Sequence, residues 1–128
     1  METIRIGDFS FQLDLTKPLY EQVLQQIRYS VARGEVALGT KLPSVRELAQ
    51  NLKINPNTVM RAYQELDRDH LIETRRGQGT FITDNLKIVE QIRQNLAYEA
   101  ARSFILAMKE LGMDVHTAKS LIEEGDWT

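Results

Sequence analysis

The sequence predicts a mainly α-helical protein in which three helices and a β-hairpin are followed by two more helices. Three observations predict this fold class. Apolar residues recur every three to four positions in five segments, and helix-capping residues precede several of these segments. A turn with two glycines separates two short apolar runs within residues 71–83. At 128 residues, the chain is long enough for one compact domain and an appendage.

The composition excludes several classes of functional site and indicates where the protein is expected to be found. The chain has no cysteine, which excludes disulfides, thiol catalysis and thiolate metal sites. No apolar run approaches the ~18 residues of a membrane-spanning helix, and the N-terminus lacks the basic-then-apolar order of a signal peptide. We therefore expect a soluble, cytoplasmic protein with no membrane partner.

Charge is distributed unevenly along the chain. The formal net charge of −2 argues against a generic polyanion binder, because phosphate attraction needs clustered cations. Residues 33–83 carry eight Lys or Arg against six Asp or Glu, whereas residues 84–128 carry five against eight. The acidity therefore belongs mainly to the C-terminal part, which leaves room for a locally basic surface.

The N-terminal segment combines an extended arm with a helix. Polar and apolar residues alternate over residues 1–16, which predicts a short half-buried strand or an arm whose partner is unknown. A first amphipathic helix is expected from Pro18, which suits a first helical position, up to Gly34. Its apolar stripe consists of Tyr20, Val23, Leu24, Ile27 and Val31.

Two helix-start signals lie close together in the middle of the chain. Ser44-Val-Arg-Glu47 matches a capping box and predicts a helix of about two turns. Asn55 and Pro56 predict the start of a third helix, because Asn accepts a hydrogen bond at the cap and Pro fixes the first helical dihedral angle. The buried stripe of this third helix is Val59, Ala62, Tyr63 and Leu66, and its opposite face carries Asn57, Arg61, Gln64 and Arg68.

A hairpin and two helices complete the chain. Residues 71–75 and 80–83 are predicted strands around the turn Arg76-Gly-Gln-Gly79. A long helix is expected from Asn85 to about Leu111, followed by a last helix that Asp114 caps. The order predicts a winged helix-turn-helix over residues 1–83, with the arm at 1–16, and a two-helix dimerisation hairpin over residues 84–128. In the last helix, the residues expected to face inward are Val115, Ala118, Leu121 and Ile122.

The exposed residues at the start of the third helix are candidate base-reading residues. In a helix-turn-helix, the N-terminal part of the second helix of the motif enters the major groove. We expect Asn57, Thr58 and Arg61 to contact bases, since Asn pairs well with adenine and Arg with guanine. The alternative is an ordinary solvated polar face.

Two further groups are candidate DNA contacts. Ser44 and Arg46 lie where free amides, the helix dipole and a guanidinium favour a phosphate, although capping alone explains Ser44. A slim basic hairpin tip suits the minor groove, although an ordinary tip has the same composition. The residues of this tip are Arg75, Arg76, Gly77, Gln78 and Gly79.

The long C-terminal helix carries an apolar stripe that predicts dimerisation. A helix of about 27 residues is ~40 Å long, which is more than a DNA-binding domain of this size covers, so part of the stripe should meet a second subunit. The stripe consists of Ala97, Ala101, Phe104, Met108 and Leu111. The sequence leaves open a small-molecule effector between the C-terminal helices, although such stripes are more often core. It would bind near Tyr98, Phe104, Met108 or Trp127.

No motif predicts an enzyme, a cofactor or a metal site. The chain lacks cysteine, clustered histidines with carboxylates, and a phosphate-cradling loop. His70, at the end of the third helix, is interpreted as a capping cation, and His116 has no ligand-like neighbour. The rival to DNA binding is a winged-helix module for protein interaction, which only the net charge supports.

Residues 18–83 resemble the GntR family of bacterial transcription regulators. The segments that carry the resemblance are Pro18-Leu-Tyr-Glu-Gln22, Leu42-Pro-Ser-Val-Arg-Glu-Leu-Ala49, Asn57-Thr-Val-Met-Arg-Ala-Tyr-Gln-Glu-Leu66 and Arg76-Gly-Gln-Gly-Thr-Phe-Ile82. The short tail is similar to that of the YtrA subfamily, in which it dimerises. The resemblance implies a homodimeric regulator, expected to be a repressor that binds a palindromic operator.

Position by position, the resemblance implies DNA contacts at Arg46, Asn57 and Thr58, and a wing tip at Gly77 and Gly79. Many relatives carry an Arg where this chain has Pro56, so one of their base contacts is missing here. The operator sequence therefore does not follow from the resemblance.

Overall fold

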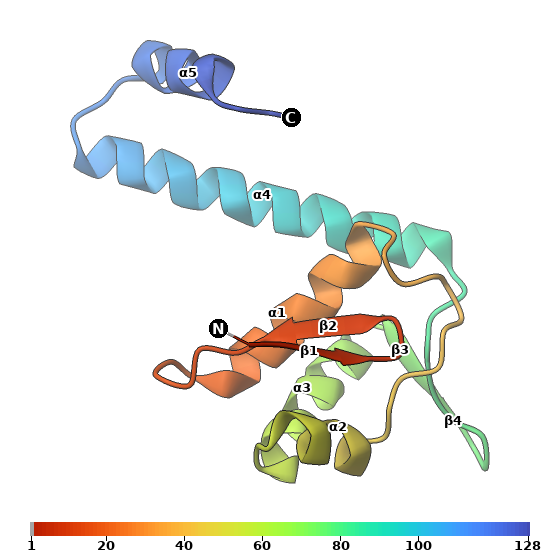
Figure 1. Cartoon of the computed structure of the whole chain (residues 1–128). Coiled ribbons are helices and arrows are strands. Elements are labelled where there is room, and N and C mark those ends of the chain that lie inside the picture. Colours follow the sequence, from red (N-terminus) through yellow and green to blue (C-terminus); the bar gives the residue numbers. More distant parts are fainter. Residues whose placement is uncertain (1) are drawn as a thin grey trace. The chain divides into compact units, whose positions relative to one another are not determined.

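The computed structural model describes residues 2–128, which form five helices and four short strands (Figure 1). In chain order, the elements are β1 (Thr3–Ile6), β2 (Phe9–Gln12), α1 (Leu19–Ala32), α2 (Val45–Leu52), α3 (Pro56–Arg68), β3 (Ile72–Arg75), β4 (Gly79–Ile82), α4 (Leu86–Glu110) and α5 (Val115–Glu124). The chain divides into a first unit that ends at Arg93 and a second unit, Gln94–Thr128. The predicted mainly helical fold with a winged helix-turn-helix is confirmed. Within residues 2–128, no helix has the length and apolar character to cross a membrane.

Helices α1, α2 and α3 build the core of the first unit. The buried stripe of α3 is Val59, Ala62, Tyr63 and Leu66, as the sequence predicts. Helix α3 packs against the other two helices, whose buried apolar residues include Val23, Leu24, Ile27, Leu48 and Leu52. The guanidinium of Arg28 on α1 also forms an ion pair with Asp69, the C-terminal capping residue of α3. Apolar burial and one polar contact thus fix α3 against α1.

The starts of α2 and α3 are fixed by capping groups. The Ser44 hydroxyl accepts a hydrogen bond from the Glu47 N–H (3.1 Å), and the Glu47 carboxylate accepts one from the Ser44 N–H (3.3 Å), so the predicted capping box forms. Asn55 caps α3 by accepting from the Asn57 N–H at 2.8 Å. The buried Tyr63 hydroxyl donates to the Pro43 carbonyl at 2.7 Å, which ties α3 to the segment before α2.

The wing contains a third extended segment that local sequence signals do not predict. Strands β3 and β4 pair antiparallel, with Ile72 opposite Ile82 and Arg75 opposite Gly79. On the other side of β4, the Leu42 N–H donates to the Thr80 carbonyl and the Ile82 N–H donates to the Thr40 carbonyl, both at 2.8 Å. The segment before α2 thereby anchors the wing beside the helix-turn-helix.

The N-terminal arm forms a β-hairpin, where the sequence predicted a short half-buried strand or an extended arm of unknown partner. Strands β1 and β2 pair antiparallel through a turn at Gly7, whose φ of 61° suits glycine. Phe9 and Phe11 are buried, at 2% exposure each. The sequence contained a signal for this hairpin. The alternating apolar residues occupy even positions up to Ile6 and odd positions from Phe9, and a two-residue turn between paired strands produces this change.

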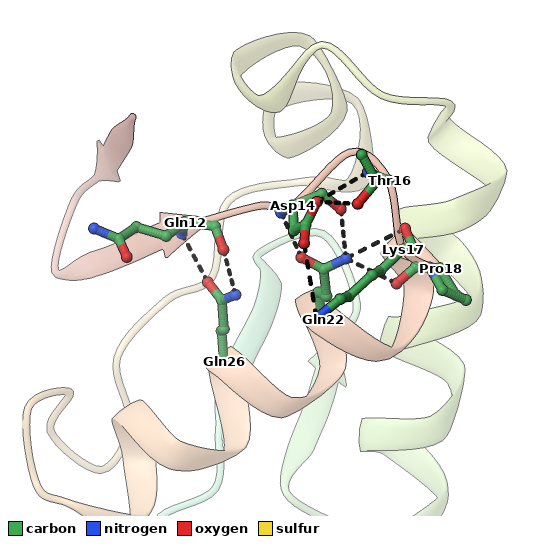
Figure 2. Close-up of polar contacts among 7 residues, drawn as sticks. All are labelled: Gln12, Asp14, Thr16, Lys17, Pro18, Gln22 and Gln26. Atoms are coloured by element: carbon green, nitrogen blue, oxygen red, sulfur yellow. Dashed lines mark hydrogen bonds and ion pairs between the residues drawn. The ribbon is translucent and has the colours of Figure 1, made fainter. Parts of the chain in front are cut away.

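Two glutamines of α1 attach this hairpin and fix the start of the helix (Figure 2). The Gln26 side chain accepts from the Gln12 N–H at 2.9 Å and donates to the Gln12 carbonyl at 2.6 Å. Its amide thus makes the pair of hydrogen bonds that the backbone of a neighbouring strand would make with Gln12. One turn earlier, Gln22 accepts from the Asp14 N–H at 2.7 Å and donates to the carbonyls of Asp14 (2.9 Å) and Pro18 (3.0 Å). The backbone before α1 is therefore held by its own helix.

The second unit consists of the end of α4 and the short helix α5. The long helix spans Leu86–Glu110, close to the predicted range, and Asp114 caps α5 by accepting from the Thr117 N–H at 2.9 Å. No residue from 97 to 128 is buried. The expectation that α5 turns an apolar face inward is wrong for a single chain, because Val115, Leu121 and Ile122 are 70%, 48% and 43% exposed.

Candidate nucleic-acid interface

The outward face of α3 carries the residues predicted to read bases. Asn57, Arg61 and Gln64 are exposed, whereas Thr58, turned toward the side of the helix, is half-buried. The Asn55 cap and Pro56 fix the first turn, so the Asn57 side chain starts from a defined backbone position. An exposed face with a rigid buried stripe beneath it is the arrangement that a recognition helix needs.

Arg61 has an aromatic partner that the sequence did not predict. The centre of its guanidinium lies 3.9 Å from the centroid of the Tyr20 ring, which belongs to the first turn of α1. Tyr20 was predicted to belong to the apolar stripe of α1, but it is only half-buried and its ring supports the Arg61 side chain. This distance is that of a cation–π contact.

Met60, which was not predicted as a candidate from the sequence, also belongs to the outward face of α3. Its side chain is 45% exposed, although it is apolar. At about 100° per residue, Met60 lies about 60° from Asn57, at the edge of the outward face. The sequence did contain a signal for this residue, because Met60 is apolar but lies outside the three- and four-residue spacing of the buried stripe. A search for polar residues alone overlooks it. Apolar side chains at such positions can contact the methyl group of thymine.

The start of α2 presents Ser44 and Arg46 to solvent. The Ser44 hydroxyl oxygen accepts the capping hydrogen bond, and its own proton remains available to another acceptor. Arg46 forms no ion pair with any other residue in the range 2–128. A free guanidinium beside a helix N-terminus suits a phosphate group.

The two arginines of the wing have different surroundings. Arg75 is half-buried, donates to Glu73 (2.8 Å) and Asp84 (3.2 Å), and stacks on Phe81 with its guanidinium 4.3 Å from the ring centroid. The hydrogen bond to Glu73 is the main reason that the pKa of Arg75 lies above its ordinary value, and the charges of Glu73 and Asp84 act in the same direction. Arg75 therefore braces the base of the wing.

The tip of the wing consists of Arg76, Gly77 and Gln78, all exposed. Arg76 makes no ion pair within the described part of the chain. Gly79 belongs to β4 rather than to the tip, with a φ of 123°, and a Cβ there would lie 2.7 Å from Cε of Lys41. This close approach brings the exposed Lys41 beside the wing, a cation that sequence analysis did not select.

The outward face of α3, the start of α2 and the wing tip all belong to the first unit. Helix α2, the start of α3 and the turn between β3 and β4 lie toward the lower side of this unit in Figure 1. Among their cations, Arg46 and Arg76 form no ion pair within residues 2–128, and Arg61 contacts the Tyr20 ring. Their polar groups suit base edges. Residues 2–128 contain no group of His, Cys, Asp and Glu side chains arranged to hold a metal ion. The arrangement suits binding to an extended polyanion.

Comparison with known proteins agrees with this arrangement. The model for "Bacterial regulatory proteins, gntR family" matches residues 19–82. The uncharacterized HTH-type transcriptional regulator YhcF of Bacillus subtilis is 47% identical over 102 residues, which are 80% of this chain and 84% of that protein. The HTH-type transcriptional repressor YtrA of the same organism is 40% identical over 109 residues, covering 84% of this chain and 83% of that protein.

Solved structures show the same likeness. A GntR family transcriptional regulator from Listeria monocytogenes has a TM-score of 0.81 and 34% identity, covering 89% of this chain and 100% of that one. YtrA from Sulfolobus acidocaldarius, a GntR-family transcription factor, has a TM-score of 0.56 and 31% identity, covering 72% and 97%. With its winged helix-turn-helix and these similarities, the chain belongs to the GntR family of bacterial DNA-binding transcription regulators, which are not enzymes.

Proposed function

We propose that this regulator is a homodimeric, cytoplasmic repressor that binds a palindromic operator in double-stranded DNA. The observation that carries the proposal is the outward face of α3, on which Asn57 and Arg61 are exposed above a buried stripe. Repression is suggested by the name of the similar YtrA repressor. No cofactor is part of the proposal.

Each part of the interface has a distinct role in the proposed complex. Asn57, Thr58 and Arg61 read base edges in the major groove, while Ser44 and Arg46 bind phosphates and set the register. The wing enters the minor groove through Arg76, Gly77 and Gln78. Arg75 and Gly79 support this tip, since one is paired with Glu73 and the other packs beside Lys41.

Dimerisation is proposed for the region 84–128. Its exposed apolar side chains include Tyr98, Ile105, Leu111 and Trp127, at 68%, 54%, 67% and 79% exposure. Of the predicted stripe, Ala97, Ala101 and Leu111 are exposed and Phe104 and Met108 are half-buried. A unit whose apolar side chains are so exposed gains stability when a second copy covers them. Two copies also present two recognition helices to successive major grooves, about 34–36 Å apart.

DNA binding is tested by selecting duplexes from a random pool with the full-length protein and measuring Kd by fluorescence anisotropy. We expect a palindrome to be selected. For each of the two base contacts that a dimer makes through this residue, Arg61→Ala should lose about 5- to 150-fold in affinity, corresponding to 1–3 kcal/mol per contact. Arg33→Ala is the matched control, because Arg33 pairs with Glu35 at the far end of α1. Selection without any consensus, or equal binding by Arg61→Ala, would contradict the proposal.

Dimerisation is tested by sedimentation. The wild-type protein should sediment with twice the 14.7 kDa mass of one chain. Phe104→Asp should shift it toward the monomer, since a buried charge without a partner is costly. Arg102→Asp is the matched control, because it places the same carboxylate about 200° around α4 from Phe104. A wild-type monomer at micromolar concentration would refute this part of the proposal.

A further inference from the structure

We propose that Tyr20 is a positioning residue for DNA recognition, which holds the Arg61 guanidinium ready for a base. This inference rests on the proposed base-reading role of Arg61. It starts from one contact: the guanidinium centre lies 3.9 Å from the centroid of the Tyr20 ring. Within residues 2–128, no carboxylate forms an ion pair with Arg61, so the ring is the partner that orients it.

Stacking and base recognition use different parts of the guanidinium. A ring contacts the flat face of the group, whereas a guanine accepts hydrogen bonds from the N–H groups along its edge. The stack on Tyr20 therefore leaves the donors available. It also restricts a long side chain that would otherwise sample many rotamers, so less conformational freedom is lost when DNA binds.

The support beneath the ring is rigid. Tyr20 is the second residue of α1, and the segment before it is fixed because Gln22 donates to the carbonyls of Pro18 and Asp14 (Figure 2). Behind it, α1 and α3 share a buried apolar core and the ion pair between Arg28 and Asp69. Ring and guanidinium thus belong to two elements whose relative position is set by packing, as preorganisation requires.

Two other roles for Tyr20 make different predictions. If the stack serves only to stabilise the packing of α1 on α3, loss of the ring lowers stability and leaves the affinity of the folded protein unchanged. If the Tyr20 hydroxyl binds a phosphate directly, its removal weakens DNA binding even when the ring is retained. A positioning role requires the ring, not the hydroxyl, and acts only through Arg61.

The test is a double-mutant cycle with Tyr20→Leu, Tyr20→Phe and Arg61→Ala, measured by anisotropy on the duplex selected by the wild-type protein. Tyr20→Leu should weaken binding by about 2- to 5-fold for each subunit of the dimer, the fold-change that corresponds to one exposed cation–π contact. Tyr20→Phe should bind within about 1.5-fold of wild type, since the ring remains. In the Arg61→Ala background, Tyr20→Leu should have no further effect.

A second readout does not depend on DNA. In the free protein, the ring current of Tyr20 should shift the Arg61 side-chain NMR resonances upfield. Tyr20→Phe should retain this shift and Tyr20→Leu should abolish it, while amide spectra and thermal unfolding show whether each variant is folded.

The outcomes separate this inference from the proposed function. Equal binding by Arg61→Ala would remove the base-reading role and the positioning role with it. Weak binding by Arg61→Ala together with wild-type binding by Tyr20→Leu would overturn the positioning role alone. The same is true if Tyr20→Phe loses as much affinity as Tyr20→Leu, or if Tyr20→Leu still weakens binding in the Arg61→Ala background.

Discussion

Tyr63 shows how one buried residue shapes the helix-turn-helix. Its ring belongs to the core, and its hydroxyl donates to the Pro43 carbonyl just before α2. Burial raises the pKa of the Tyr63 phenol above its ordinary value of 10.0, and the charge of Glu47 raises it further. The neutral phenol is therefore the form that the folded state requires.

This pKa shift predicts a loss of stability in alkali. Because the unfolded chain releases the proton first, the stabilisation is complete below about pH 10 and is lost as the pH rises toward the higher pKa of the folded state. The free energy of unfolding should fall by up to about 1.4 kcal/mol per pH unit in that window. Urea titrations from pH 8 to 11 measure it.

Tyr63→Phe should make the free energy of unfolding less dependent on pH in alkali. It should also lower this free energy by about 1 kcal/mol at neutral pH, because the hydrogen bond is lost. Tyr29→Phe is the control, since Tyr29 is 40% exposed. An unchanged alkaline decline in Tyr63→Phe would show that other groups cause it.

Met60 gives a prediction about sequence preference. Its exposed side chain lies on the same face of α3 as Asn57. We expect it to contact a thymine methyl group, so replacing that thymine by deoxyuridine should weaken wild-type binding and leave Met60→Ala unaffected. Anisotropy on duplexes substituted one thymine at a time measures this. If every thymine can be replaced without loss, Met60 reads no methyl group.

At the scale of elements, the turn between α2 and α3 contains a conformational conflict. Lys53, the C-terminal capping residue of α2, has a φ of 57°, in the left-handed region that disfavours residues with a Cβ atom. Lys53→Gly should therefore raise the free energy of unfolding by about 1 kcal/mol, as measured by urea denaturation. Lys53→Ala retains the Cβ atom and should give no such gain, so an equal gain in both variants would assign the effect to the charge.

Elements with local signals were predictable from the sequence, and elements that depend on distant partners were less so. The capping box at Ser44 and the Asn55–Pro56 pair fixed the starts of α2 and α3, because caps satisfy backbone groups only a few residues away. The bridge between Lys41 and Phe81 joins segments far apart in the chain and leaves no local signal. The N-terminal hairpin lies between these cases, since its phase change was visible but its docking to Gln26 was not.

In the candidate site, too, features set by local sequence were predictable and features set by tertiary packing were not. The outward direction of Asn57 follows from helical periodicity alone. The stack of Arg61 on Tyr20 depends on how α1 packs against α3, which periodicity does not give. Likewise, the two neighbouring arginines of the wing look equivalent in sequence, and only the positions of Glu73 and Asp84 distinguish Arg75 from Arg76.

At the scale of the whole molecule, a dimer should double the electrostatic effect of each phosphate contact. For a protein on duplex DNA, the slope of log affinity against log salt changes by about 0.9 per phosphate contact. Arg46→Ala removes two contacts from a dimer, so its slope should be shallower by about 2, with Arg33→Ala unchanged. Anisotropy titrations at several salt concentrations give these slopes. A change of about 1 would indicate that a single subunit binds.

The exposed apolar side chains of the second unit have a consequence for how the amount of this protein in a cell affects its activity. No side chain beyond Leu96 is buried within one chain, so in the proposed dimer the shared surface would be completed only when two copies meet. Below the dissociation constant of such a pair, halving the number of molecules in a cell lowers the number of pairs about fourfold. The quantity of the regulator would then act as a signal in its own right, and a modest change in its synthesis would switch target genes sharply.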